Sequence, residues 1–339
     1  MAVVNSIHWI KLLQKIVAWV MRLWVALLLF FGSEIVLWAN PSSRELQDWV
    51  LIAIAYLALS TLLLDVIQRY RIRNLSGLLF VSGLYALLAS LIINPETTLI
   101  DVPRTIATRV LGAHTFVAWM MLSFMLILSD GPRRKSGVAV PILSAIAGFG
   151  WGVWVRYFPL EADTTRAVVS LETMLGRGVP VIFAILVLFI ILFRNTKHIS
   201  ADDLRLVPML RFGVVIIMVG VFVLRFDSTF YPDAAFGIVT SLIVFAGLVV
   251  WFQAQTQRRT LLDRRIPIRP LFPPLIVLSM TSFTGLGAVG YGLPREVIGV
   301  DLLAVLTGMF TIFGIVWLPL VSVILGIQAF QQQVRSEDI

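Results

Sequence analysis

One carboxylate stands in a segment that is otherwise apolar enough for the interior of a bilayer. It is Glu34, and residues 29–38 around it read LFFGSEIVLW. A charged side chain at the centre of a bilayer costs at least ~2.5–3.5 kcal/mol, and such residues are usually functional. An isolated carboxylate there would take up a proton, so an ionised Glu34 requires a basic group within hydrogen-bonding reach. The residue type and its setting indicate a substrate or proton site.

Other ionisable residues occupy similar apolar surroundings near the same membrane face. A helix rises ~1.5 Å per residue, so Glu34, four residues before Trp38, and His114, five residues after Arg109, should lie at similar depth, about one turn below the interface. Trp154 and Tyr157 also mark that interface as aromatic anchors. The predicted outer polar site comprises Glu34, Arg109, His114, Arg156, Arg225 and Asp227. The alternative is an ion pair that only fixes helix packing near the headgroups.

A second pair of charges is expected near the opposite face. Arg22 lies about two turns into the first apolar run, and Asp65 lies near the end of the second. Adjacent antiparallel helices would bring the two side chains together, and a packed pair satisfies both charges. We therefore predict Arg22 and Asp65 to form a structural ion pair.

Several kinds of chemistry find no support in the sequence. The chain has no cysteine and only three histidines, and only His114 is deep in an apolar run, so we expect no haem, no metal site and no cofactor. It contains no P-loop, no zinc-protease motif and no nucleophile elbow. An enzyme is not the favoured interpretation.

The elements that must position these residues are membrane helices. Of the 339 residues, 59% are hydrophobic and 14% are charged, and the mean hydropathy is +0.93. Repeated apolar runs of 18 or more residues predict an all-α polytopic membrane protein with short loops. About ten spans are expected, at 16–38, 49–68, 75–93, 105–129, 137–158, 177–194, 210–226, 235–254, 272–292 and 301–329.

The charges of the loops predict the orientation of these spans. One side, which includes both termini, carries 19 of the 27 Lys and Arg residues but 7 of the 19 Asp and Glu residues. Loops rich in Lys and Arg stay on the cytoplasmic side, so both termini should be cytoplasmic and the chain should lie in the cytoplasmic (inner) membrane. The formal charge of +8 then predicts contact with anionic lipid headgroups rather than with nucleic acid.

Two loop segments have helical patterns of their own. Residues 162–178 have apolar residues at helical spacing and predict a helix lying on the outer surface. Residues 200–210 predict a short helix on the inner side, with Ser200 and Asp203 as a capping pair.

Glycines are concentrated in two predicted spans. Residues 147–154 read AGFGWGVW and residues 284–292 read TGLGAVGYG. Alternate glycines do not share one helix face, so we do not expect the small-xxx-small packing motif. Two interpretations remain open: broken helices that line a site, or close packing on two sides.

The whole chain is expected to form a single membrane domain, with possible halves at 16–158 and 177–329. Ten spans with an outer loop after the fifth would suit two five-span halves of opposite orientation, as in many transporters. No residue-level match between the halves supports this directly.

Three functions remain. A secondary transporter or carrier is favoured by the span number and the intramembrane charges. A non-catalytic subunit of a larger membrane complex is favoured by the short loops and the ten tryptophans. A membrane enzyme acting on a lipid-linked substrate would use Glu34 or His114 as acid or base and arginines to hold a phosphate or carboxylate.

Overall fold

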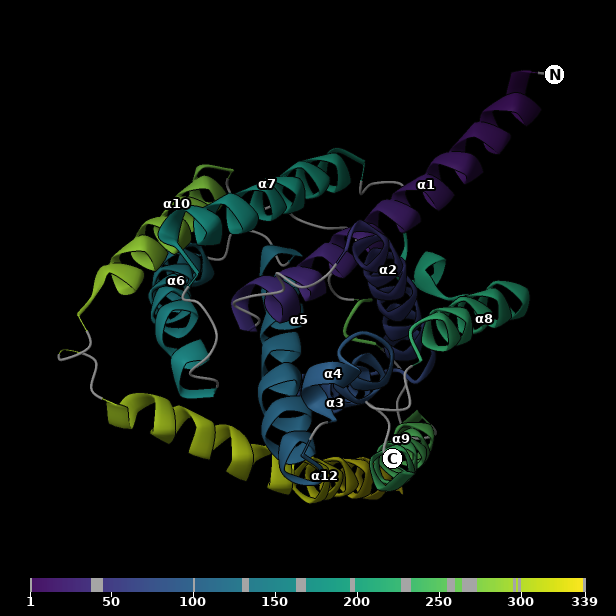
Figure 1. Ribbon diagram of the computed structural model, residues 1–339. Helices are drawn as coiled ribbons and strands as arrows, with labels where there is room; N and C mark the ends of the chain where they lie inside the picture. The colour runs from purple at the N-terminus through teal and green to yellow at the C-terminus, as the bar shows by residue number, and fades with distance from the viewer. Residues whose placement is uncertain are drawn as a thin grey trace. The chain divides into compact units, whose positions relative to one another are not determined.

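The computed structural model shows a helical chain (Figure 1). It describes residues 2–37, 45–99, 101–129, 134–162, 169–195, 199–226, 233–254, 260–263, 273–294, 297 and 300–337. Within these residues there is no β-strand. The elements are α1 (Ala2–Phe30), η1 (Phe31–Leu37), α2 (Leu46–Arg69), α3 (Leu75–Ile92), α4 (Pro95–Thr98), η2 (Ile106–His114), α5 (Thr115–Ser129), α6 (Arg134–Ala162), α7 (Leu171–Asn195), η4 (Ala201–Leu204), α8 (Pro208–Leu224), α9 (Asp233–Ala254), α10 (Pro273–Gly292) and α12 (Val300–Glu337).

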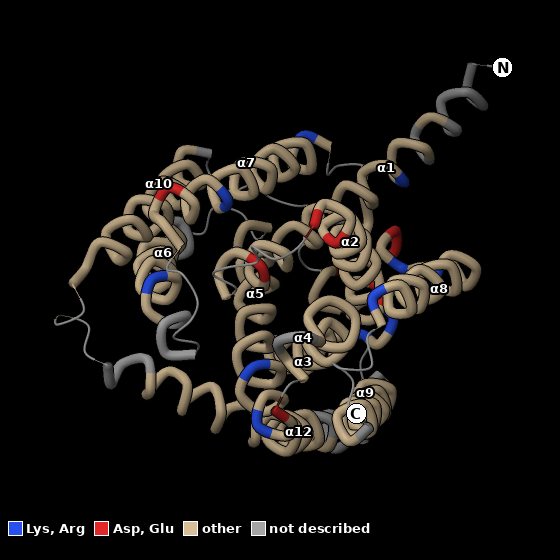
Figure 2. Tube along the Cα trace, in the orientation of Figure 1, with Lys and Arg blue, Asp and Glu red and all other residues tan. Residues whose placement is uncertain are grey.

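The prediction of an all-α polytopic membrane protein is confirmed. In the described part of the chain, nine helical segments are long and apolar enough to cross a bilayer, two of them made by η1 continuing α1 and by η2 leading into α5. The remaining predicted span is α8, whose 17 residues are apolar but shorter than the others. Figure 2 marks the few charged residues along these helices.

The predicted surface helix over 162–178 is wrong where the structure describes it. Residues 163–168 lie outside the described part, and from Leu171 onward the segment forms the first turns of α7. The helical spacing of apolar residues in this segment did indicate a helix, but that helix is α7, which continues to Asn195. For residues 200–210 the capping pair is confirmed: Ser200 and Asp203 form a reciprocal capping box. The helix that they cap, η4, covers only Ala201–Leu204, and from Pro208 onward the segment belongs to α8; its place on the inner side stays a prediction.

The chain divides into two compact units. Unit 1 comprises residues 1–45, 121–199 and 265–306 and contains α1, η1, α6, α7 and α10. Unit 2 comprises residues 46–120, 200–264 and 307–339 and contains α2, α3, η2, α8, α9 and most of α12. Each unit takes helices from both predicted halves of the sequence.

In unit 1, α6 and α10 pack along each other with their backbones in close approach. A Cβ atom added at Gly148 would overlap the carbonyl oxygen of Phe283, and one added at Gly152 would overlap that of Gly287. Gly148 and Gly152 are four residues apart and therefore share one helix face. The expectation that these glycines make no small-xxx-small face was wrong, because it considered their alternation and not this pair.

Both glycine-rich helices run unbroken through their glycines. Close packing therefore explains Gly148 and Gly152, whereas Gly150 has no neighbour within 4 Å of a built Cβ. Of the two interpretations that the sequence left open, the structure favours close packing over broken helices at this position.

In unit 2, α2 packs against α3 and α8, and α3 packs against α9. The π-helix η2 meets α12 through Gly112 and Gly314, where an added Cβ would overlap a carbonyl oxygen of the other helix. Trp317 of α12 fits over Gly83 of α3 and stacks on Phe80, with ring centroids 5.1 Å apart. The Trp317 ring thus occupies the space left by the missing side chain of Gly83 and packs α12 against α3.

The irregular helical turns lie where the sequence placed intramembrane charges. Glu34 belongs to η1, and Arg109 and His114 belong to η2. A π-helix carries i→i+5 hydrogen bonds, is rare, and is frequently found at functional sites. Hydropathy gave no sign of either segment.

Candidate functional site

Glu34 is fully buried in η1, with 0% of its surface exposed. The carbonyl groups at the end of this π-helix are satisfied by α6: Trp151 donates its indole N–H to Ile35 O, and Trp154 donates to Leu37 O, each at 2.9 Å. Trp151 and Trp154 are three residues apart and so lie on one face of α6. These two bonds hold the segment that carries Glu34 against α6.

Trp151 joins four segments of unit 1. It is 2% exposed and lies against Gly178 of α7 and Gly287 of α10, where an added Cβ would come within 3 Å of the indole ring. Its ring also stacks on Phe283, with centroids 5.1 Å apart and planes 22° apart. Because residues 178 and 287 are glycines without side chains, the indole ring has room to pack between α7 and α10.

Arg156 lies five residues beyond Trp151, where α6 approaches the end of α10. Its Nη1 donates to the carbonyl oxygen of Tyr291, and its guanidinium carbon lies 5.3 Å from the Tyr157 ring centroid and 5.4 Å from that of Tyr291. Tyr157 donates its hydroxyl to Leu293 O, and Tyr291 donates its hydroxyl to Val169 O. The guanidinium is thus held by two fixed aromatic rings and a carbonyl, all of them uncharged.

Arg177 at the start of α7 is a residue that the sequence analysis did not select. Its Nη1 is buried and has no hydrogen-bond partner among the described residues. Its neighbour Gly178 packs on Trp151, so Arg177 belongs to the same junction. The prediction placed the sixth span at 177–194 and so treated Arg177 as a boundary charge; its position two turns into α7 was the missing information.

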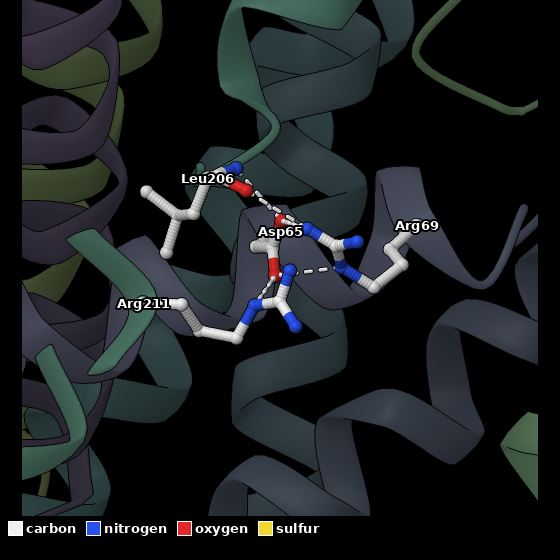
Figure 3. A network of polar contacts seen from close by, with 4 residues as sticks. All are labelled: Asp65, Arg69, Leu206 and Arg211. Carbon is white, nitrogen blue, oxygen red and sulfur yellow. Dashed lines mark hydrogen bonds and ion pairs between the residues drawn. The ribbon is translucent and has the colours of Figure 1, made fainter. Parts of the chain in front are cut away.

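A different arrangement surrounds Asp65 in unit 2 (Figure 3). Asp65 accepts hydrogen bonds from Arg69 Nε at 3.2 Å, from Arg69 Nη2 at 3.1 Å and from the backbone N–H of Leu206 at 2.8 Å. Arg211 of α8 forms an ion pair with the second carboxylate oxygen at 3.2 Å. Arg69 also donates to Leu206 O at 2.9 Å. This cluster joins α2, α8 and the segment between η4 and α8, which contains Leu206.

One turn away, Gln68 fastens a second loop to the same end of α2. Its amide donates to Asp263 at 3.1 Å and accepts from the Thr260 hydroxyl at 2.8 Å. The backbone N–H of Leu261 donates to Ile72 O at 2.7 Å. The end of α2 therefore holds two loops that are far apart in the sequence.

The predicted site residues divide between the two units. Glu34 and Arg156 lie in unit 1, while Arg109, His114 and Arg225 lie in unit 2. Arg225 donates to Ile93 O at 2.8 Å. Asp227 lies outside the described residues. Within unit 1, Trp151 and Trp154 hold the η1 segment that carries Glu34, whereas Arg156 lies about 140° round α6 from Trp151. A convergence of these residues with one another, or with Arg109 or His114, stays a prediction.

The predicted pair of Arg22 and Asp65 also stays a prediction, because its members belong to different units. Arg22 is 3% exposed, and its guanidinium lies 4.9 Å from the Trp19 ring centroid. Arg69 and Arg211 are partners of Asp65 that the sequence analysis did not foresee.

No protein family, curated protein or solved structure matches the chain. Among the described residues there is also no group of three or more His, Cys, Asp or Glu side chains placed to hold a metal ion. The groups in unit 1 that could do chemistry are the buried carboxylate of Glu34, the two arginines Arg156 and Arg177, and aromatic hydrogen-bond donors.

Proposed function

We propose that this multi-pass membrane protein is a secondary transporter, a carrier whose polar site opens to the outside. The observation that carries the proposal is the pairing of its helices. Counting the spans from the N-terminus, the first packs on the sixth (α1 on α7), the second on the seventh (α2 on α8) and the third on the eighth (α3 on α9). Each of these pairs joins span n to span n+5.

The remaining two pairs do not join span n to span n+5, but the same shift of five converts one of them into the other. The fifth span packs on the ninth (α6 on α10), and the fourth packs on the tenth (η2 and α5 on α12). If every span n is exchanged with span n+5, the fifth becomes the tenth and the ninth becomes the fourth, so the first pair becomes the second. In both pairs, glycines also allow the two helix backbones to come into contact. This correspondence supports two related five-span halves.

Five is an odd number, so two such halves lie in opposite orientations in the membrane. Inverted repeats of this kind are a common basis of secondary transporters, which open alternately to the two sides. Irregular backbone at membrane depth is tolerated against protein or a water-filled cavity, and here it carries Glu34, Arg109 and His114. The π-helices η1 and η2, rather than broken glycine helices, are the segments we assign to the transport path.

The absence of native cysteine makes the proposal directly testable. Single cysteines would be placed at Ser33, beside Glu34, and at Thr61, which is fully buried in α2, with the exposed Ile216 as control. In proteoliposomes, a carrier should let a membrane-impermeant maleimide reach Ser33→Cys and Thr61→Cys from water, and Ile216→Cys should react only slowly because it faces lipid. If neither buried position reacts from either side, the carrier proposal fails.

Topology is a separate part of the proposal. We place both termini in the cytoplasm and the chain in the cytoplasmic membrane, on the basis of the charge bias of the loops. A reporter fused to the C-terminus should be active only in its cytosolic form. Activity of a reporter that functions only outside the cytosol would reverse the assignment of inner and outer ends.

A subunit of a larger membrane complex is the second candidate, and one observation favours it. Between 61% and 72% of the residues are buried in the first four spans, but between 22% and 28% in the last four long spans. Partner helices could cover those exposed faces as well as lipid does. Native mass spectrometry after mild extraction decides between the two: a stoichiometric protein partner would favour the subunit, and a lone chain would favour the carrier.

A further inference from the structure

We propose that Arg156 and Arg177 form a binding site for an anionic oxygen group, a carboxylate or a phosphate, at the end of unit 1 that we predict to face outward. The inference rests on the proposed carrier function and adds to it the chemical class of the solute. It also assigns a role to Arg177, which the predicted outer site did not include.

The first argument is the way in which Arg156 is held. Its contacts with the Tyr157 and Tyr291 rings and with the Tyr291 carbonyl orient the guanidinium plane but involve no carboxylate. A guanidinium has five N–H donors. The contacts described use one of them, so the others remain to bind a ligand. Arginine in a fixed orientation suits two-point recognition of carboxylate and phosphate.

The second argument is the unsatisfied nitrogen of Arg177. A buried charged group without a hydrogen-bond partner is costly, and native structures rarely keep one. One nitrogen of the half-buried Arg177, Nη1, is buried and has no hydrogen-bond partner among the described residues. An oxyanion placed against it would supply the missing acceptor together with an opposite charge.

The third argument is proximity within one packed junction. Gly178, next to Arg177, packs on Trp151, and Trp151 lies on the helix that carries Arg156 five residues further on. α10 packs against both α6 and α7, and its Tyr291, which contacts Arg156, also donates its hydroxyl to Val169 O, two residues before α7. By comparison, Arg104 is 78% exposed and pairs with Asp101 at 3.6 Å. Arg69 and Arg211 likewise pair with Asp65, whereas the described contacts of Arg156 and Arg177 are not with acids.

The test uses the purified full-length protein in a neutral detergent. Sodium phosphate and sodium succinate serve as probes, with sodium chloride at equal ionic strength as reference, and binding is measured by calorimetry and by the thermal unfolding midpoint. We expect a saturable rise of the midpoint with one or both probes. Arg177→Gln and Arg156→Lys should each weaken the binding at least tenfold, and Arg104→Gln should leave it unchanged.

Arg177→Gln is the sharper variant, because Arg177 has no described hydrogen bond whose loss would unfold the protein. Arg156→Lys keeps the charge and one donor to Tyr291 O but loses the planar fork. If the wild-type protein binds neither probe more strongly than chloride and retains no anionic lipid, the inference fails. It also fails if both variants bind as the wild type does.

A lipid headgroup and a free solute offer the same chemistry, and a second measurement separates them. In nanodiscs made with phosphatidylglycerol or with phosphatidylcholine, native mass spectrometry would show whether an anionic lipid stays bound to the wild-type protein and is lost from Arg177→Gln. Retention of lipid without binding of the soluble probes would identify a headgroup as the occupant. Binding of the soluble probes in phosphatidylcholine would identify a solute.

Failure of this inference can be distinguished from failure of the carrier proposal. The labelling of Ser33→Cys and Thr61→Cys does not depend on which anion binds. Labelling without anion binding would overturn only the site, and anion binding without labelling would overturn only the carrier.

Discussion

Two clusters of arginines, one in each unit, meet the problem of a buried charge in opposite ways. Around Asp65 both arginines face an acid: a carboxylate that is 1% exposed receives Arg69, Arg211 and a backbone N–H. Around Trp151 no described contact of the arginines is with an acid: Arg156 is held by tyrosine rings and a carbonyl, and one nitrogen of Arg177 has no described partner.

The difference separates structural from functional charge. A cluster whose arginines face a buried acid stabilises the fold and has little capacity left for an anionic ligand. Arginines without a described acid keep that capacity. The Asp65 cluster should therefore respond to mutation through stability, and the Arg156 and Arg177 cluster through binding. The predictions below test that contrast, from the largest expected effect on stability to the smallest.

Replacement of Asp65 by Asn should have the largest effect. It leaves Arg69 and Arg211 without their buried counter-charge and replaces one of the two acceptor oxygens by an NH2 donor, and breaking a buried ion pair costs about 3 kcal/mol or more of unfolding free energy. Unfolding followed by steric trapping in bicelles would measure it. Asp101→Asn is the control, since that acid is 60% exposed and its ion pair is a surface pair. Equal effects of the two substitutions would contradict the structural role of Asp65.

Substitution of Gly152 by Ala should have the next largest effect. The new methyl group would overlap the carbonyl oxygen of Gly287 and push α6 away from α10, with an expected loss of ~1–3 kcal/mol. Gly150→Ala is a matched control on the same helix, because no atom lies within 4 Å of its built Cβ. That change should be neutral or mildly stabilising. Thermal unfolding of both variants in one detergent gives the comparison, and the reverse order would refute the glycine interface.

Trp151→Phe should cost less. The ring can still stack on Phe283, but Ile35 O loses its donor in a buried position, which typically costs ~1–2 kcal/mol. Trp251→Phe, in an exposed position on α9, is the control. The two unfolding midpoints should differ, and the midpoint of Trp251→Phe should match that of the wild type. If Trp151→Phe leaves the unfolding midpoint unchanged, the hydrogen bond from Trp151 does not hold η1 in place.

Arg177→Gln should change stability least. Because its buried nitrogen has no described partner, its loss should leave the unfolding free energy within about 1 kcal/mol of the wild type, or raise it. Unfolding measured without added phosphate or succinate would check this. A large loss of stability would mean that Arg177 is structural after all, and the contrast between the clusters would disappear.

Sequence patterns predicted the helices well because burial in a bilayer leaves a strong hydropathy signal. The number and order of the spans follow from apolar runs, with α8 as the short exception. The capping box of Ser200 and Asp203 was also predictable, since it depends on residues three positions apart.

The arrangement of the charges was less predictable, for a physical reason. Asp65 binds the N–H of Leu206, which is 141 positions away, and no local pattern encodes such a contact. The π-helical turns around Glu34 and Arg109 have the hydropathy of ordinary helix. Arg177 was missed because a helix boundary had been placed at that very residue. The depth of a residue in the membrane can be estimated by counting along the sequence. The sequence pattern does not reveal which helices pack against each other.

The C-terminal end of α2 has a consequence for how unit 2 can move. Through Asp65 it holds the N–H of Leu206, and through Ile72 O, just past the helix end, it holds the N–H of Leu261. Both amides sit in connecting segments, where backbone protons normally exchange with water quickly. Here they should exchange as slowly as those of a helix, so these two connectors would travel with α2 as one rigid body and leave bending to other joints of the chain.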